Sequence, residues 1–212
     1  RSAVFGVLFP DPIERREFVR LATQVTHSDH RAFVGALAVA EMAALALVTP
    51  LGRKPDRDDV CTRLRVMVSD DPEWLKLVDR MGEGWRNGVS VADFASLLGL
   101  GRGVSGYVYH TVPVALYGWF AYYGDVRETL NAVIPCGGDT DSTGAIAGAL
   151  AGVSAGADAI PAEYTGRLYR SFSDDDGQTW SPAQATDIPN PASKITLLKI
   201  EDKTVLIHNP TA

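Results

Sequence analysis

The stretch of sequence that decides the fold is Gly137-Gly138-Asp139-Thr140-Asp141-Ser142-Thr143-Gly144. Its two leading glycines let the backbone fold tightly, and its two aspartates lie two positions apart just before an expected helix. In a loop or a first helical turn, the carboxylates of Asp139 and Asp141 can converge on one point, and Ser142 can add a hydroxyl. Such hard oxygen donors suit Mg²⁺, Mn²⁺ or Ca²⁺. The alternative interpretation is simple helix capping, since aspartate and serine are favoured at helix N-termini.

The helix expected after this stretch carries a glycine every four residues, which leaves one of its faces bare. These glycines are Gly144, Gly148, Gly152 and Gly156. Each glycine in a helix interior costs about 1 kcal/mol relative to alanine. We therefore expect a central helix along which another helix packs unusually close.

The sequence before this stretch predicts helices almost throughout. The apolar spacing and the polar breaks place them at 11–48 (two helices separated at 26–29), 58–68, 72–81, 94–98, 111–123 and from Asp125 to Ile134. Ser90 and Asp93 have the spacing of a capping box before the helix at 94–98. The fold class is therefore mainly all-α up to about residue 165.

The pattern changes after residue 165. The remaining chain is rich in Asp, Ser, Thr and Pro, and it then alternates apolar and polar residues at 194–200 and 204–207, with a turn between them. This alternation is typical of a β-hairpin. We expect a first domain over residues 1–165 and a short C-terminal β appendage over 167–212, which is too small for an ordinary independent β domain.

The amino-acid composition of the chain limits the kinds of molecule that it is expected to bind. The 212 residues include 20 Lys and Arg against 26 Asp and Glu, a formal charge of −6, so the overall field repels nucleic-acid backbones. The two cysteines, Cys61 and Cys136, match no metal-binding spacing. The longest apolar run, 32–48, contains Glu41 and is shorter than the roughly 20 residues of a membrane span. We expect a cytoplasmic protein with no nucleic-acid partner and no membrane span, and its oligomeric state stays open.

Residues 137–148 resemble the late metal-binding motif of the ADP-ribosylglycohydrolase family, which includes the dinitrogenase reductase-activating glycohydrolases. Residues 26–29 with the alanine-rich helix after them, and residues 106–108 with 111–116, resemble the middle motifs of the family in the same order. The resemblance covers about residues 1–165. It implies an all-α domain that holds two Mg²⁺ ions in a cleft, with Mn²⁺ as a substitute, and that hydrolyses an N- or O-glycosidic bond of ADP-ribose in an ADP-ribosylated substrate.

The resemblance also assigns site residues. It implies that metal is held by Asp139, Asp141 and Ser142, and that ADP-ribose is bound by His27, Gly106, Tyr107, Gly137 and Gly138. The early glycine and acid segment of the family and its early Thr-Asp-Asp metal motif are absent from this sequence. We therefore expect the catalytic residues upstream of residue 1, and we expect this chain alone to bind metal weakly and to turn over little.

Three other interpretations remain. The chain could be a non-catalytic remnant that binds ADP-ribose or a nucleotide. The glycines at 101, 103 and 106 match the dinucleotide-binding pattern, but that pattern requires a preceding strand and the sequence there predicts a helix. Residues 173–180 resemble the Asp-box of sialidase-like β-propellers, and the resemblance extends through 167–212. In that family the Asp-box is a structural staple, so it does not by itself imply a carbohydrate-cleaving activity.

Overall fold

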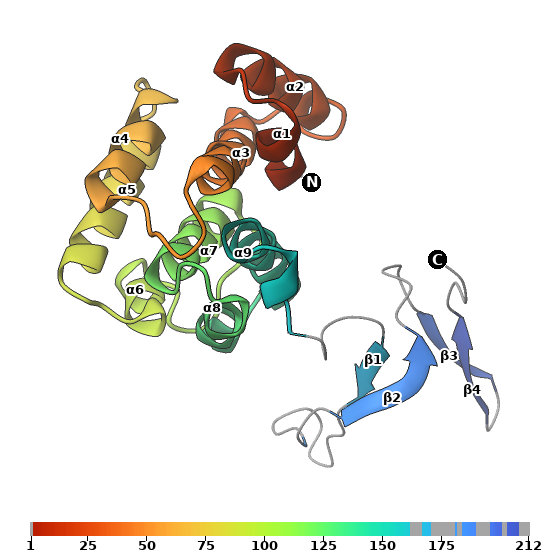
Figure 1. Cartoon of the computed structure of the whole chain (residues 1–212). Coiled ribbons are helices and arrows are strands. Elements are labelled where there is room, and N and C mark those ends of the chain that lie inside the picture. The colour runs from red at the N-terminus through yellow and green to blue at the C-terminus, as the bar shows by residue number, and fades with distance from the viewer. Residues whose placement is uncertain are drawn as a thin grey trace. The chain divides into compact units, whose positions relative to one another are not determined.

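The computed structural model describes residues 2–161, 167–170, 181, 184–189, 196–200 and 203–207, and it divides the chain into two compact units, Arg1–Ala159 and Ile160–Ala212. The described part of the first unit is helical (Figure 1). Its α-helices are α1 (Ser2–Leu8), α2 (Pro12–Gln24), α3 (His30–Val48), α4 (Arg57–Val66), α5 (Pro72–Arg86), α6 (Val91–Leu97), α7 (Val108–Ala121), α8 (Val126–Val133) and α9 (Thr140–Ala155). Short 3₁₀ turns follow α8 and α9, at Ile134–Cys136 and Ala157–Ala159.

Most of these helices begin where the sequence places a capping side chain. Such a side chain accepts a hydrogen bond from a first-turn amide and so satisfies a backbone donor that has no partner within the helix. The capping residues are Asp11, Asp29, Asp56, Asp71, Ser90 and Asp125. The Ser90 capping box is confirmed, because Ser90 Oγ accepts from the Asp93 amide at 3.1 Å and donates to the Asp93 carboxylate at 2.7 Å.

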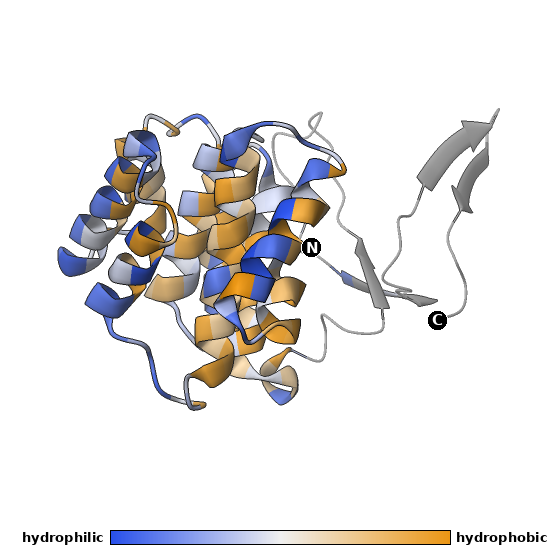
Figure 2. Cartoon of the chain, turned by 90° about the horizontal axis from the view of Figure 1, so that it is seen from above, coloured by the Kyte–Doolittle hydropathy of each residue, from blue (hydrophilic) through white to orange (hydrophobic). Residues whose placement is uncertain are grey.

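Helix α7 lies at the centre of the unit and contacts α3, α5, α6, α8 and α9 (Figure 1). Apolar residues concentrate in the central helices, and hydrophilic residues cover the outer ones (Figure 2). The core around α7 is aromatic: Trp74, Tyr109, Tyr117 and Trp119 are fully buried, and the rings of Phe94 and Tyr117 stack with their centroids 4.0 Å apart. Buried aromatic rings remove a large apolar area from water, so they contribute to the stability of the bundle.

By length and composition alone, helix α3 could cross a membrane. From the sequence, we expected a shorter apolar run that could not. In this structure it packs against α1, α2, α7 and α9, and it buries residues from Val34 to Ala46. Its one acidic residue, Glu41, accepts two hydrogen bonds from Arg15 of α2, at 2.8 and 2.9 Å. This nearly buried ion pair compensates the charge that interrupts the apolar run.

The structure corrects several expectations. Helix α1 was not predicted, α5 continues to Arg86, and α7 begins at Val108 rather than at residue 111. The expected close packing along the glycine face of α9 is not seen at Gly144 and Gly148, where an added Cβ would make only ordinary contacts with the turn after α8, at 3.6 Å, and with α8, at 3.4 Å. Helices approach most closely at Gly6 of α1, where an added Cβ would overlap the backbone of Ala40 in α3, and at Gly35 and Gly118, where it would overlap the side chains of Val108 and Val133.

The second unit is described through four strands. Strand β1 (Arg167–Arg170) pairs antiparallel with β2 (Gln184–Pro189), and β3 (Thr196–Ile200) pairs antiparallel with β4 (Lys203–Ile207) in the register Thr196 to Ile207. The segment that resembles an Asp-box, residues 173–180, lies outside the described residues.

Candidate functional site

Two loops meet through their backbones although the residues that they pair, Val104 and Gly138, are 34 positions apart in the sequence. The amide of Val104 donates to the carbonyl of Gly137 at 3.0 Å, and the amide of Asp139 donates to the carbonyl of Val104 at 2.7 Å. These two bonds form a short parallel bridge between Val104 and Gly138. The bridge joins the glycine loop before α7 to the loop before α9. It also follows helix α6 rather than a strand, so the dinucleotide-binding interpretation of the glycine loop does not hold.

Glycine is required where the two loops touch. Gly138 has a φ of +76°, and a Cβ at this position would overlap the backbone of Val104. Gly106 plays a different role, because a Cβ there would come within 2.9 Å of the Asp139 Oδ2 atom. The absence of side chains at these glycines therefore lets the turn before α7 approach the Asp139 carboxylate.

The carboxyl groups of Asp139 and Asp141 lie in hydrogen-bond contact with each other. This contact with Asp139 is the main cause that holds the pKa of Asp141 below its ordinary value, and the amide of Ser142 acts in the same direction. Asp141 and Ser142 are exposed, whereas Asp139 is half-buried. Two carboxylates this close are favourable only when a proton or a cation offsets their repulsion.

The two helices that meet at this bridge differ from their neighbours at their N-termini. Tyr107 precedes α7 and Asp139 precedes α9, and neither side chain makes a capping hydrogen bond. Among α2 to α9, all the other helices are capped by a side chain. The positive ends of the two helix dipoles are therefore not offset by an N-cap side chain on this side of the bundle.

Tyr107 is held by a chain of polar contacts that runs across three helix N-termini. Its hydroxyl donates to Glu73 of α5 at 3.3 Å, and Arg31 of α3 donates from Nε to the same carboxylate at 3.0 Å. Partial burial is the first cause that raises the pKa of the Tyr107 hydroxyl, and the negative charge of Glu73 adds to it. The phenol is therefore a neutral donor near pH 7, and Glu73 fixes where it points.

A buried network lies next to this chain. Asp71 accepts a hydrogen bond from the Tyr109 hydroxyl at 2.5 Å and from the Trp74 amide at 2.9 Å, and His30 Nε2 lies 4.0 Å from its carboxylate. Burial alone would raise the pKa of Asp71, but these hydrogen bonds outweigh it and hold the pKa below the ordinary value of 3.8. Asp71 thus has its hydrogen-bonding capacity satisfied within the protein.

His27 lies in the exposed turn between α2 and α3, with its Nδ1 atom 2.8 Å from Thr26 Oγ1. It lines a pocket of about 310 Å³ together with Asp29, His30 and Phe33. None of the residues that line this pocket belongs to the loops at 103–107 or 137–142. Glu73 connects this turn to the start of α7, because it accepts hydrogen bonds from both Arg31 and the Tyr107 hydroxyl.

The donors present suit a hard cation. Asp139 and Asp141 offer carboxylate oxygens within contact of each other, Ser142 adds a hydroxyl beside them, and Gly106 leaves no side chain over Asp139 Oδ2. Divalent magnesium and manganese prefer such oxygen ligands. The described part of the chain holds no group of three or more His, Cys, Asp or Glu side chains placed for a metal, so these residues supply only part of a coordination shell.

The structure therefore brings most of the predicted site residues into one place. Gly106, Gly137, Gly138, Asp139 and Asp141 meet at the bridge, Ser142 and Tyr107 flank it, and His27 is separate. Arg31 and Glu73, which position Tyr107, were missed. Their only sequence signal is a place in the first turn of a helix, which is also where solvated charges are common. The metal and substrate roles of these residues stay predictions.

The chain matches the model of the ADP-ribosylglycohydrolase family over residues 1–192. It is 23% identical over 186 residues to "ADP-ribosylhydrolase ARH3" of Gallus gallus, and the alignment covers 76% of this chain and 49% of the relative. The chain thus spans about half the length of this curated relative. The family match passes the boundary expected near residue 165, and neither match supports the sialidase-like resemblance.

Proposed function

Because the chain belongs to the ADP-ribosylglycohydrolase family, we propose that it forms part of a metal-dependent site that cleaves a glycosidic bond between ADP-ribose and a protein side chain or small molecule. The observation that carries this proposal is the backbone bridge, which holds Gly106 against the carboxylate of Asp139. The family match supports glycosidic hydrolysis, and the loop geometry supports a place for it in this chain.

The bridged loops would bind and orient the sugar and its diphosphate. Cleavage at the anomeric carbon of ribose passes through a state with oxocarbenium character, so a fixed ribose and a positioned water lower the barrier. Asp139, Asp141 and Ser142 would hold Mg²⁺ or Mn²⁺. When bound, such an ion would orient the ribose hydroxyls and lower the pKa of the attacking water.

The uncapped helix ends supply the other half of the proposed recognition. Neither α7 nor α9 has an N-cap side chain bonded to its first turn, and helix N-termini favour phosphate groups. We assign the diphosphate of ADP-ribose to these helix N-termini. Tyr107, anchored by Glu73, then forms a wall of the same site.

Thermal unfolding of the whole chain tests this proposal. Mg²⁺ with ADP-ribose should raise the Tm of the wild type, since a ligand that binds only the native state stabilises it. Asp139→Asn should lose that rise. Asp125→Asn is the matched control, because Asp125 also precedes a helix but caps it, so this variant should keep the rise. Equal rises in all three proteins, or none in the wild type, would contradict the proposal.

Turnover separates a hydrolase from a remnant that only binds. Free ADP-ribose released from an ADP-ribosylated peptide, dependent on Mg²⁺ and lost in Asp139→Asn, would establish hydrolysis by this chain. Binding with no release would favour the non-catalytic alternative. The sialidase-like hypothesis for residues 167–212 stays a separate prediction, and release of sialic acid from a fluorogenic glycoside tests it.

A further inference from the structure

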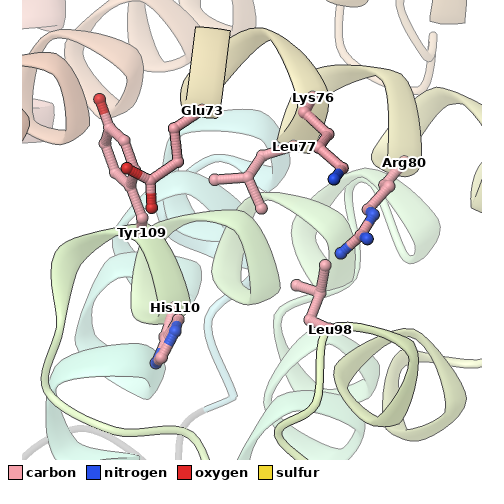
Figure 3. Close-up of a pocket in the computed structure, with 7 residues that line it drawn as sticks. All are labelled: Glu73, Lys76, Leu77, Arg80, Leu98, Tyr109 and His110. Atoms are coloured by element: carbon pink, nitrogen blue, oxygen red, sulfur yellow. The ribbon is translucent and has the colours of Figure 1, made fainter. Parts of the chain in front are cut away.

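A pocket of about 190 Å³ lies between α5 and the first turn of α7, at the end of α6 (Figure 3). Lys76, Leu77 and Arg80 come from α5, Leu98 follows α6, and His110 comes from α7. The pocket therefore shares the start of α7 with Tyr107 and the bridged loops. The site proposed above does not use any of these five side chains.

The charges at this pocket are not compensated by the protein. Lys76 and Arg80 are four residues apart on one helix, which places two like charges side by side at a cost to helix stability. Their head groups point into the same space above Leu98 (Figure 3). Among the described residues neither has an ion pair or a hydrogen bond, whereas nearby Arg31 and Arg65 are paired with Glu73 and Asp79.

The one acidic side chain at the pocket is already engaged. Glu73 accepts hydrogen bonds from Arg31 and from the Tyr107 hydroxyl, one on each carboxylate oxygen. Both carboxylate oxygens of Glu73 therefore have partners other than Lys76 and Arg80. In a protein with a formal charge of −6, a pair of cations without a protein acid between them leaves a local site for an anion.

The other walls of the pocket limit the shape of that anion. The ring of His110 is fixed by a contact of 2.8 Å between its Nδ1 atom and Ser105 Oγ, and by the edge of the Tyr107 ring, whose centroid is 5.0 Å away. Its Nε2 atom has no partner in the described part of the chain. Leu77 and Leu98 give the pocket an apolar side. The lining fits a small oxyanion on a short apolar stem.

We propose that this pocket is a subsite for a compact oxyanion, a carboxylate or a phosphate group, held by Lys76 and Arg80 with His110 beside them. The subsite deepens the function proposed above and rests on it for one point: the oxyanion belongs to the acceptor that carries ADP-ribose, such as an acidic side chain close to the modified residue. Free inorganic phosphate offers the same chemistry and is the other source.

Methyl NMR of the full chain tests the subsite without metal or ADP-ribose, with labelled leucines as reporters. Titration with inorganic phosphate, and separately with a blocked peptide that contains one glutamate, should shift the Leu77 and Leu98 signals in a saturable way. The double variant Lys76→Gln/Arg80→Gln should bind about tenfold more weakly or worse, since it loses two charge-assisted contacts. Arg53→Gln/Arg86→Gln removes the same charge at exposed positions outside the pocket and should bind as the wild type does.

The outcomes separate the sources and the two proposals. Saturation by the peptide but not by phosphate assigns the subsite to an acceptor chain, and saturation by both assigns it to the oxyanion itself. Absence of saturable shifts with either probe overturns the subsite, as does undiminished binding in Lys76→Gln/Arg80→Gln. Asp139→Asn should keep this binding even though it loses the response to Mg²⁺ and ADP-ribose, so failure of one proposal is visible without failure of the other.

Discussion

Asp71 and Asp139 occupy the same position in two helices of one bundle, the residue just before the first turn, yet they do opposite things. Asp71 is buried and accepts hydrogen bonds from the Trp74 amide and the Tyr109 hydroxyl. Asp139 makes no capping bond and instead contacts Asp141 beside the open face of Gly106. The difference distinguishes an aspartate that stabilises the fold from one whose oxygens are left for a ligand.

The same contrast extends to whole helices. Side chains cap α2 to α6 and α8, and the two helices in this series without a side-chain cap, α7 and α9, are the two that the Val104 bridge joins. Uncapped ends cost stability unless something else supplies an acceptor. Their coincidence at one place is therefore better evidence for a site than the aspartate spacing alone.

The largest effect should come from breaking the bridge. Gly138→Ala forces a side chain into a left-handed backbone and into the backbone of Val104, so we expect a loss of about 3 kcal/mol in the free energy of unfolding. Gly52→Ala is the matched control, because Gly52 has the same φ of +76° but open space around it. It should cost only about 1 kcal/mol. Urea unfolding measures both, and equal losses would mean that the bridge adds nothing beyond the turn.

The comparison of the two aspartates can be tested directly. Asp71→Ala removes a cap and leaves the buried Tyr109 hydroxyl without its acceptor, so we expect a loss of about 2 kcal/mol in stability. Asp139→Ala removes no cap and should cost less than about 0.5 kcal/mol. The effects on the response to Mg²⁺ and ADP-ribose should be reversed, with the response lost only in Asp139→Ala. Similar stability losses in the two variants would contradict the division of roles.

The dependence of the unfolding free energy on acid pH also tests the structural role of Asp71. The pKa of Asp71 is lower in the folded protein than its ordinary value of 3.8, so its stabilising contribution is complete above that pH and is lost as the pH falls below it. Asp71→Asn should therefore show a shallower loss of unfolding free energy than the wild type below about pH 4. Urea unfolding between pH 3 and 7 measures this. Parallel pH profiles would mean that Asp71 is not the group responsible.

The smallest effect on stability should come from the link between α5 and α7. Glu73→Gln breaks an exposed pair with Arg31, so it should leave the free energy of unfolding almost unchanged. It also replaces the charged acceptor of the Tyr107 hydroxyl by a weaker, neutral one, so the affinity for ADP-ribose should fall by a few-fold. Glu17→Gln, which breaks the exposed pair with Arg20 on α2, should leave that affinity unchanged. Calorimetric titration distinguishes the two, and equal affinities would remove Glu73 from the site.

The sequence predicted those parts of the fold that local chemistry controls. Proline and aspartate at the start of α5, the Ser90 capping box and the polar break before α3 each act within one helical turn, so they are readable from neighbouring residues. The prediction of helix bounds and helix packing failed where these features depend on contacts between distant parts of the chain. The start of α7 was placed three residues late, since Tyr107 carries no capping signal. The glycines of α9 indicated a close contact, whereas the helices approach each other more closely at Gly6, Gly35 and Gly118.

The candidate site divides in the same way. The sequence by itself determined that Asp139, Asp141 and Ser142 stand together at the start of a helix, because that follows from their spacing. Only the tertiary structure decided that Gly106 lies against Asp139, that Glu73 holds Tyr107, and that His27 stands apart. The reason is physical, because the bridge consists of backbone hydrogen bonds between Val104, Gly137 and Asp139. Backbone donors and acceptors are the same in almost every residue, so the pattern of side chains does not indicate which two loops will pair.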